Sequence, residues 1–328
     1  MPDRLSDLQA KLLEILRQNG RAFVSAAVLA QLVDLPAADL PAQCAELEEL
    51  GCPLERDNSG AIRLANADPL LAAEIEYRLK TEKLGRVLHQ YGDIGSTNIR
   101  AAELAESGAP EGTLVLADRQ LHGKGRLSRN WHSPSGVGIY QSLVLRPKMS
   151  AAAASGISLV AALALVETIE NLYSLQASIK WPNDILLDGR KLAGILTELT
   201  SDGDRVRHII LGIGINCNQT KFPAEIAGLA TSLRLALGHA IVRVELLCGF
   251  LHTFENLYQQ MQQAGLIALL PQIKAHSAVL GKRISFRSQA QARSGIAVDI
   301  DPSGMLIVES GGAQITLAAG EITLEDNY

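Results

Sequence analysis

The chain is poor in aromatic residues and cysteine, and both shortages restrict what it can be. Only 4% of its 328 residues are aromatic while 47% are hydrophobic, so its cores must be packed mainly with aliphatic side chains. Its four cysteines form neither a C-x-x-C pair nor a cysteine–histidine ligand pattern, which argues against a zinc site or a disulfide framework. We therefore expect reduced core thiols in a cytoplasmic protein.

The sequence also lacks a long uninterrupted apolar run and the pattern of a secretory signal peptide. The most apolar window, 155–172, is broken by serine, threonine and glutamate, so it predicts a buried helix and no membrane span. The first 18 residues are amphipathic and have neither a basic leading region nor a long apolar region, so we expect no signal peptide. The net charge of −5 argues against a protein that coats DNA throughout, although it allows a local basic patch.

The order of predicted elements indicates an α+β protein of three domains. Residues 1–66 predict three short helices, the second capped by Ser25, and then a hairpin turning at 58–60, which is typical of a winged helix-turn-helix domain. Residues 67–274 alternate helices and strands. They include a long helix over 151–175 and another over 243–264.

A strong hairpin signal, Asp188-Gly189, lies between two strand-like runs of this middle domain. Strands joined directly by hairpins favour a mixed, largely antiparallel sheet over a Rossmann fold. Residues 275–328 read as a run of short strands with turns at 302–304 and 311–312, which predicts a small β-barrel.

The stretch GKGRLSRNWHSP, residues 123–134, is a cationic glycine loop in an acidic chain. Its glycines allow backbone N–H groups to approach an anion, and Lys124, Arg126 and Arg129 add positive charge. It is not a Walker A loop, because no serine or threonine follows the lysine. Taken alone, the pattern fits a solvated surface loop as well as it fits an anion-binding loop.

Three other segments carry polar residues in suggestive places. KWPNDILLDGRKLAGIL, residues 180–196, predicts a hairpin whose carboxylate Asp184 is of the kind that Mg²⁺ uses beside substrate phosphates. GIGINCN, residues 212–218, has glycines that thin a strand so that a ligand or backbone can approach. GSTN, residues 95–98, opens a helix with hydroxyl and amide groups. Each alone also fits an ordinary hairpin, strand end or helix cap.

Together, in this order and spacing, the four segments resemble the biotin protein ligase family. The family loop is G-R-G-R-x-G-R followed by W and S-P, and residues 123–134 follow this pattern with two substitutions. KWPND with RKLAGIL matches without substitution. The three-domain order is similar to that of family members that are both ligase and biotin operon repressor, with a winged helix, a catalytic domain and an SH3-like barrel. A lipoate-attaching relative shares the catalytic fold, but the loop and KWPND favour biotin.

The resemblance implies that biotin is activated with ATP to biotinyl-5′-AMP and then transferred to a lysine of the biotin carboxyl carrier protein of acetyl-CoA carboxylase. It implies these sites: for catalysis, Lys191, Arg126 and Lys124; for biotin, Ser96, Thr97, Asn98, Gln120, Lys124, Gly125, Arg126 and Lys191; for ATP and the adenylate, Arg126, Arg129, Trp131, Lys180, Asn183 and Asn216; and for Mg²⁺, Asp184. A homodimer is the expected assembly, without membrane association.

The sequence departs from the family pattern at three points. Lys124 replaces the usual arginine and Ser128 replaces a glycine, changes that we expect activity to survive. No tryptophan follows GIGIN to cover the adenine. We therefore expect an aliphatic or phenylalanine lid from Phe222, Ile226 and Leu229.

The charge of residues 1–66 argues against DNA binding. This region has six Lys or Arg and ten Asp or Glu, a net charge of −4, and the expected recognition helix within 36–51 has no cation. It also contains Pro41, expected in the helix interior at a cost of about 3 kcal/mol. Only Arg56 and Arg63 remain to contact operator DNA. Two hypotheses stay open: a ligase that is also a repressor, and a ligase whose winged helix is structural.

Overall fold

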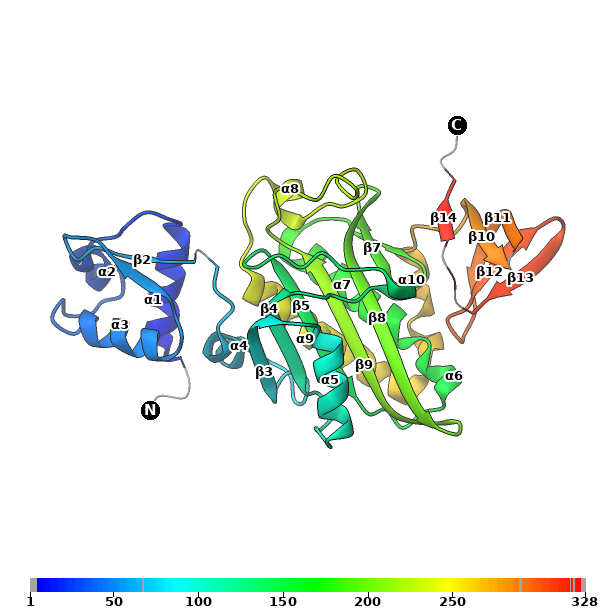
Figure 1. The fold of residues 1–328 in the computed structure, drawn as a ribbon, viewed down its shortest axis with the longest axis horizontal. Helices are drawn as coiled ribbons and strands as arrows, with labels where there is room; N and C mark the ends of the chain where they lie inside the picture. The colour runs from blue at the N-terminus through cyan, green and yellow to red at the C-terminus, as the bar shows by residue number, and fades with distance from the viewer. Residues whose placement is uncertain (1–4, 67, 289–290, 319, 321, 326–328) are drawn as a thin grey trace. The chain divides into compact units, whose positions relative to one another are not determined.

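The computed structural model describes residues 5–66, 68–288, 291–318, 320 and 322–325 (Figure 1). The chain divides into two compact units. The N-terminal unit comprises Met1–Lys80 with Val242–Cys248, and the main unit comprises Thr81–Ile241 with Gly249–Tyr328.

The N-terminal unit begins with three short helices and a hairpin, as expected. Its elements are α1 (Asp7–Gln18), α2 (Ala26–Leu32), α3 (Leu40–Glu49), β1 (Leu54–Arg56), β2 (Ile62–Leu64) and α4 (Ala72–Arg78). Ser25 caps α2 by accepting a hydrogen bond from the Val28 N–H, which confirms the expected cap. The core of this unit is aliphatic, with Leu12, Leu13 and Leu29 at most 1% exposed.

The expectation that Pro41 interrupts the interior of the third helix is wrong. Helix α3 begins at Leu40, so Pro41 lies in the first turn. A proline there loses no intrahelical hydrogen bond, because the first N–H groups of a helix have no partner within it. The residue starts the helix instead of destabilising it.

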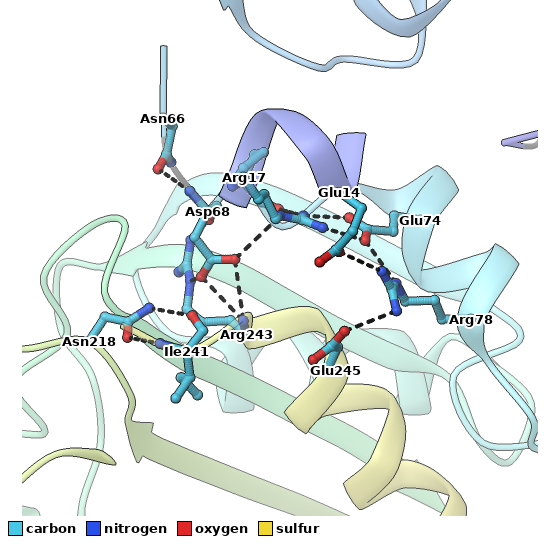
Figure 2. A network of polar contacts seen from close by, with 11 residues as sticks. Glu14, Arg17, Asn66, Asp68, Glu74, Arg78, Asn218, Ile241, Arg243 and Glu245 are labelled. Atoms are coloured by element: carbon cyan, nitrogen blue, oxygen red, sulfur yellow. Dashed lines mark hydrogen bonds and ion pairs between the residues drawn. The ribbon is translucent and has the colours of Figure 1, made fainter. Parts of the chain in front are cut away.

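Figure 2 shows a buried ionic network in the N-terminal unit. Arg17 of α1 donates to both carboxylate oxygens of Glu74 on α4, at 2.6 and 2.5 Å. Arg243, the first residue of α9 (Arg243–Ala264), donates through Nε to Asp68 Oδ2 at 2.7 Å. Burial alone would lower the pKa of Arg17, but the hydrogen bonds and charge of Glu74 raise it. The network therefore joins α1, the segment before α4 and the start of α9.

The main unit is built on a seven-stranded mixed sheet, as the hairpin signals predict (Figure 1). Its order is β3-β4-β5-β9-β8-β7-β6, and β3 and β4 are its parallel pair. The strands are β3 (Leu88–Ile94), β4 (Leu114–Gln120), β5 (Gly138–Leu145), β6 (Ser178–Lys180), β7 (Asp184–Leu187), β8 (Arg190–Asp202) and β9 (Arg205–Asn216).

The turn between β7 and β8 is the one that Asp188-Gly189 predicts. Leu187 pairs with Arg190, and the two residues between them have φ values of 50° and 73°. A two-residue turn of this kind requires positive φ at both positions, which asparagine, aspartate and glycine adopt most readily. The hairpin carries Lys191 and Asp184 on adjacent strands.

The α-helices that follow β3 in the chain are α5 (Thr97–Glu106), α6 (Ala151–Ala154), α7 (Ile157–Tyr173), α8 (Leu233–Leu237), α9 and α10 (Leu270–Ala275). Helix α5 packs against β4, β5 and β9, and α7 packs against β6, β7 and β8. The long helix expected over 151–175 is broken at Gly156, where an added Cβ would lie 2.8 Å from Leu266 Cδ2. The segment Ala151–Tyr173 is long and apolar enough to cross a membrane, but 72% of its most apolar window is buried in the protein, as in a core helix.

The C-terminal strands form a second, fully antiparallel sheet in the order β13-β12-β11-β10-β14. They are β10 (Arg283–Ser288), β11 (Gln291–Ile300), β12 (Leu306–Ser310), β13 (Ala313–Leu317) and β14 (Ile322–Leu324). The turns at 302–304 and 311–312 join β11 to β12 and β12 to β13, as expected. This sheet contacts the larger one through Trp181, whose Nε1 donates to the Gly304 carbonyl at 2.9 Å.

Replacing Glu74 with alanine should destabilise the N-terminal unit strongly. The Arg17 and Glu74 side chains are only 4% and 2% exposed, so the change leaves a buried charge without its carboxylate and should cost about 3–5 kcal/mol. A urea titration of the full chain measures the loss. Glu48→Ala removes the exposed Arg56–Glu48 pair of the same unit and should cost at most about 1 kcal/mol. Equal losses in the two variants would contradict the expectation.

Candidate functional site

A cavity of about 770 Å³ in the main unit collects the residues that the four sequence segments contribute. Its walls come from the start of α5, the loop 123–134, the β7–β8 hairpin, β9 and the segment 222–230. Every candidate residue that the sequence suggests in this unit lines it: Ser96, Thr97, Asn98, Gln120, Lys124, Gly125, Arg126, Arg129, Trp131, Lys180, Asn183, Asp184, Lys191 and Asn216.

The start of α5 gives the cavity a buried polar corner. Gln120 at the end of β4 accepts from the N–H and the hydroxyl of Thr97, at 2.8 and 3.0 Å. Ser142 Oγ lies 2.7 Å from Asn98 Oδ1. The buried Ser96 hydroxyl makes no hydrogen bond to any residue that the structure describes, so it does not serve as an ordinary helix cap. These hydroxyl and amide groups suit a neutral polar ring.

Two glycines of β9 make room for protein side chains. A Cβ on Gly212 would lie 1.9 Å from Asn98 Oδ1, and a Cβ on Gly214 would lie 2.3 Å from Trp131 Nε1. The sequence suggests that these glycines admit a ligand or another backbone. The structure shows instead that Asn98 and Trp131 lie against the bare strand and form part of the cavity wall.

The loop 123–134 is closed on itself by backbone hydrogen bonds. Gly125 N–H donates to the Arg129 carbonyl at 2.7 Å, and Trp131 N–H donates to the Gly123 carbonyl at 2.8 Å. A Cβ on Gly123 would lie 2.6 Å from the Trp131 oxygen, so this close approach requires glycine. The loop is therefore a compact structure and not a slack solvated segment.

Two cations that line the cavity, Arg126 and Lys191, each have a polar partner. Arg126 donates to Asn183 Oδ1 at 2.8 Å, which joins the loop to the β6–β7 connection. Lys191 Nζ lies 2.7 Å from Asp184 Oδ1 and 5.4 Å from the centre of the Trp131 ring. These contacts hold the side chains in place and limit the repulsion between like charges.

The segment after β9 lies beside Lys191. The Lys191 N–H donates to the Leu229 carbonyl at 2.7 Å, and the Lys191 carbonyl accepts from the Thr231 N–H at 2.9 Å. Phe222, Ile226 and Leu229 all line the cavity, and Leu229 is 69% exposed. The apolar lid over the adenine that the sequence suggests for these three residues stays a prediction.

The cavity has no ready-made cage for a metal ion. Among the residues that the structure describes, no group of three or more histidine, cysteine, aspartate or glutamate side chains could hold one. Asp184 offers a single carboxylate, which is paired with Lys191. Such a site fits Mg²⁺ that arrives on nucleotide phosphates and keeps most of its waters, because Mg²⁺ needs only one or two protein carboxylates.

Sequence reasoning missed residues that line the cavity and one that contacts two of its wall residues. Glu198 of β8 contacts Asn98 and Lys124, and its position could have been found from strand alternation, since 194, 196 and 198 share a face. The C-terminal residues Gly320 and Ile322–Leu324 also line the cavity, and the Gly320 carbonyl accepts from Arg126 at 3.1 Å. No local pattern signals a contact between residues so far apart in sequence.

The two expected DNA contacts in the N-terminal unit are already ion-paired. Arg56 donates to both oxygens of Glu48, at 2.7 and 2.9 Å. Arg63 Nη2 lies 2.6 Å from Glu55 Oε2, and its guanidinium lies 4.3 Å from the centre of the Phe23 ring. The hydrogen bonds with Arg56 lower the pKa of Glu48, so this carboxylate stays charged. DNA phosphates would have to compete with these carboxylates.

Comparison with known proteins agrees with the motifs. Residues 92–216 match the biotin/lipoate A/B protein ligase family model, and residues 279–324 match the biotin protein ligase C-terminal domain. The chain is 36% identical over 322 residues to the bifunctional ligase/repressor BirA of Bacillus subtilis, covering 97% of this chain and 99% of that protein. It is 35% identical over 232 residues to the biotin–[acetyl-CoA-carboxylase] ligase of Paracoccus denitrificans, covering 69% and 96%.

A solved structure shares the fold of the main unit. The biotin protein ligase from Aquifex aeolicus in complex with biotin and ATP superposes with a TM-score of 0.64 at 29% identity, covering 73% of this chain and 99% of that one. Together with the near-complete coverage of the Bacillus subtilis relative, this places the chain in a family. The chain belongs to the biotin protein ligase family.

Proposed function

We propose that the chain is a biotin–protein ligase that activates biotin with ATP and transfers it to a lysine of the biotin carboxyl carrier protein. The observation that carries the proposal is the cavity in which a polar corner, six lysine and arginine side chains and the apolar residues of the segment 222–230 meet. Release of pyrophosphate from ATP that depends on biotin, followed by labelling of a carrier domain, tests it. Labelling with lipoate in place of biotin would point to the lipoate-attaching relative.

In the first step a carboxylate oxygen of biotin attacks the α-phosphorus of ATP, a P–O bond forms, and pyrophosphate leaves. Both reactants are anionic, so the site must offset their repulsion. Lys191 would neutralise the carboxylate, and Lys124 and Arg126 the α-phosphate. Cations that are already in place stabilise the charge on the phosphoryl oxygens more in the transition state than in the ground state.

The remaining groups would bind and orient. Ser96, Thr97, Asn98 and Gln120, with Gly125, would contact biotin. Arg129, Trp131, Lys180, Asn183 and Asn216 would contact the nucleotide. Asn216 is oriented by Gln219, whose Nε2 donates to Asn216 Oδ1 at 3.2 Å. The loop 123–134 would cover the adenylate and shield the mixed anhydride from water.

In the second step the amine of the carrier lysine attacks the biotinyl carbonyl carbon. The C–O bond to the phosphate breaks, AMP leaves, and the amine loses its proton to solvent. No side chain of the enzyme needs to act as a covalent nucleophile. Mg²⁺, when bound with ATP, would neutralise phosphate charge, held by Asp184 beside the Asn183 amide.

The finer architecture is part of the proposal. Residues 1–66 would form a winged helix-turn-helix domain, 67–274 the catalytic domain and 275–328 an SH3-like barrel. The bridge between Val24 and Ile62, beside the β1–β2 hairpin, supports a wing. A homodimer in the cytoplasm remains our expectation. All four cysteines are buried, and burial raises the pKa of Cys52 and Cys248 to about 12, in keeping with unreactive core thiols.

Repression of a biotin operon is a second candidate function. It is supported by a similarity that extends over 97% of this chain to a protein named a bifunctional ligase/repressor. The physical argument for a structural domain is the acidic helix α3 and the ion-paired Arg56 and Arg63. If the domain binds operator DNA, Arg56 and Arg63 must leave Glu48 and Glu55 and pair with DNA phosphates instead.

Lys191→Met should slow adenylate formation by about 100- to 1000-fold, because it removes a preorganised charge at the reacting carboxylate. Release of pyrophosphate, measured with saturating biotin and ATP, gives the rate. Lys148→Met is the matched control, since this exposed lysine does not line the cavity, and it should leave the rate unchanged. Full activity in the Lys191 variant would contradict its role.

Phe222→Ala should weaken ATP binding and leave biotin binding unchanged. Loss of apolar cover on the adenine corresponds to about 1–2 kcal/mol, or about a 5- to 30-fold rise in the KM for ATP. Steady-state kinetics with each substrate varied in turn separate the two constants. An unchanged KM for ATP in the double variant Phe222→Ala with Ile226→Ala would show that the adenine lies elsewhere.

DNA binding, if present, should depend only weakly on salt. Each N-terminal unit that contacts DNA would bring two wing cations. These cations predict a slope of about −1.8 per bound unit in the plot of log K against log salt concentration. Fluorescence anisotropy with the upstream region of the chain's own biotin operon, with biotin and ATP present, measures the slope. Glu48→Gln, which releases Arg56, should tighten binding. A much steeper slope would mean that cations other than Arg56 and Arg63 contact the phosphates.

A further inference from the structure

Glu198 on β8 contacts two of the candidate site residues with one carboxylate. Its Oε2 accepts a hydrogen bond from Asn98 Nδ2 at 2.7 Å, and its Oε1 lies 3.5 Å from Lys124 Nζ. Asn98 belongs to the start of α5, and Lys124 belongs to the cationic loop. The carboxylate therefore connects the polar corner of the cavity with the loop.

The first of these contacts determines how the Asn98 amide is turned. A carboxylate can only accept hydrogen bonds, so the Asn98 NH₂ group must face Glu198. The amide oxygen then faces Ser142 Oγ, 2.7 Å away. Asn98 is only 5% exposed and lies against Gly212, so it has little space in which to turn.

The same corner is connected back to the loop on its other side. From Asn98 the hydrogen bonds continue through Ser142, the hydroxyl and N–H of Thr97, Gln120 and Ser133 to the carbonyl of Trp131, with distances of 2.7, 2.8, 2.8, 3.0 and 3.0 Å. We call this series, with Glu198 at its head, the polar relay. It starts beside Lys124 and ends at Trp131, so both of its ends lie on the loop 123–134.

Folding stability does not account for the second contact. The Lys124 and Glu198 side chains are 44% and 42% exposed, and exposed ion pairs contribute little to stability. Lys124 is, however, one of the two loop cations assigned to the α-phosphate. The Glu198 carboxylate therefore keeps the Lys124 ammonium group close to the cavity before substrate binds.

We propose that Glu198 is a positioning residue of the ligase reaction. It holds the Asn98 amide in one orientation toward the ureido ring of biotin, and it holds Lys124 where the phosphate will meet it. This inference rests on the proposed function. It adds Glu198 to the residues of the site, with Oε2 orienting Asn98 and Oε1 positioning Lys124.

Two substitutions separate the two contacts. Glu198→Gln keeps an oxygen that can accept from Asn98 but loses the charge that holds Lys124. We expect its KM for biotin to stay within about 2-fold of the wild-type value and its rate of pyrophosphate release to fall about 10-fold. Glu198→Ala loses both contacts, so its KM for biotin should also rise by about 10-fold or more.

Glu106→Ala is the matched control, because it removes an exposed ion pair with Arg207 outside the cavity and should leave both constants unchanged. A wild-type chain that releases no pyrophosphate would refute the proposed function itself. An active wild-type chain whose two Glu198 variants behave alike, or like the wild type, would overturn the role of Glu198. If thermal melting shows that Glu198→Ala does not fold, a raised KM for biotin in Glu198→Gln would overturn it equally.

Discussion

The site depends on keeping several cations close together in a chain that is acidic overall. Lys124, Arg126 and Lys191 all line one cavity, where two anions must meet. Like charges at this spacing repel, so each is placed beside an acceptor: Glu198, Asn183 and Asp184 respectively. The acceptors come from β8, the β6–β7 connection and β7, so the sheet positions Lys124 and Arg126 of the loop as well as Lys191 of its own strand β8.

The bare surface of β9 is the second requirement. Because Gly212 and Gly214 have no side chain, Asn98 and Trp131 can lie directly on the strand. Asn98 and Trp131 thus form part of the wall of a cavity of about 770 Å³ that is polar at one corner. The glycines of the GIGIN motif therefore act at least partly by making room for two side chains of the same chain.

The fold and the site were predictable where information is local. The Asp188-Gly189 turn and the helix 243–264 follow from turn chemistry and periodicity, and the motif residues converge because each segment ends at the same part of the sheet. Contacts between distant residues were not predictable. The burial of Arg17 against Glu74 has no periodic signal. Pro41 lies in the first turn because α3 begins at Leu40, and the sequence did not indicate that start within the expected range 36–51.

The helix α9 has a consequence for how the chain can be divided. Its first turns belong to the N-terminal unit, and the remainder belongs to the main unit. Arg243 at its start is fully buried and hydrogen-bonded to Asp68, which lies far earlier in the sequence. A protein shortened to begin after residue 80 would retain this arginine and lose its carboxylate, so an orphaned charge would remain at the head of the helix. A cut at residue 80 would therefore divide the N-terminal unit itself, because that unit includes Val242–Cys248.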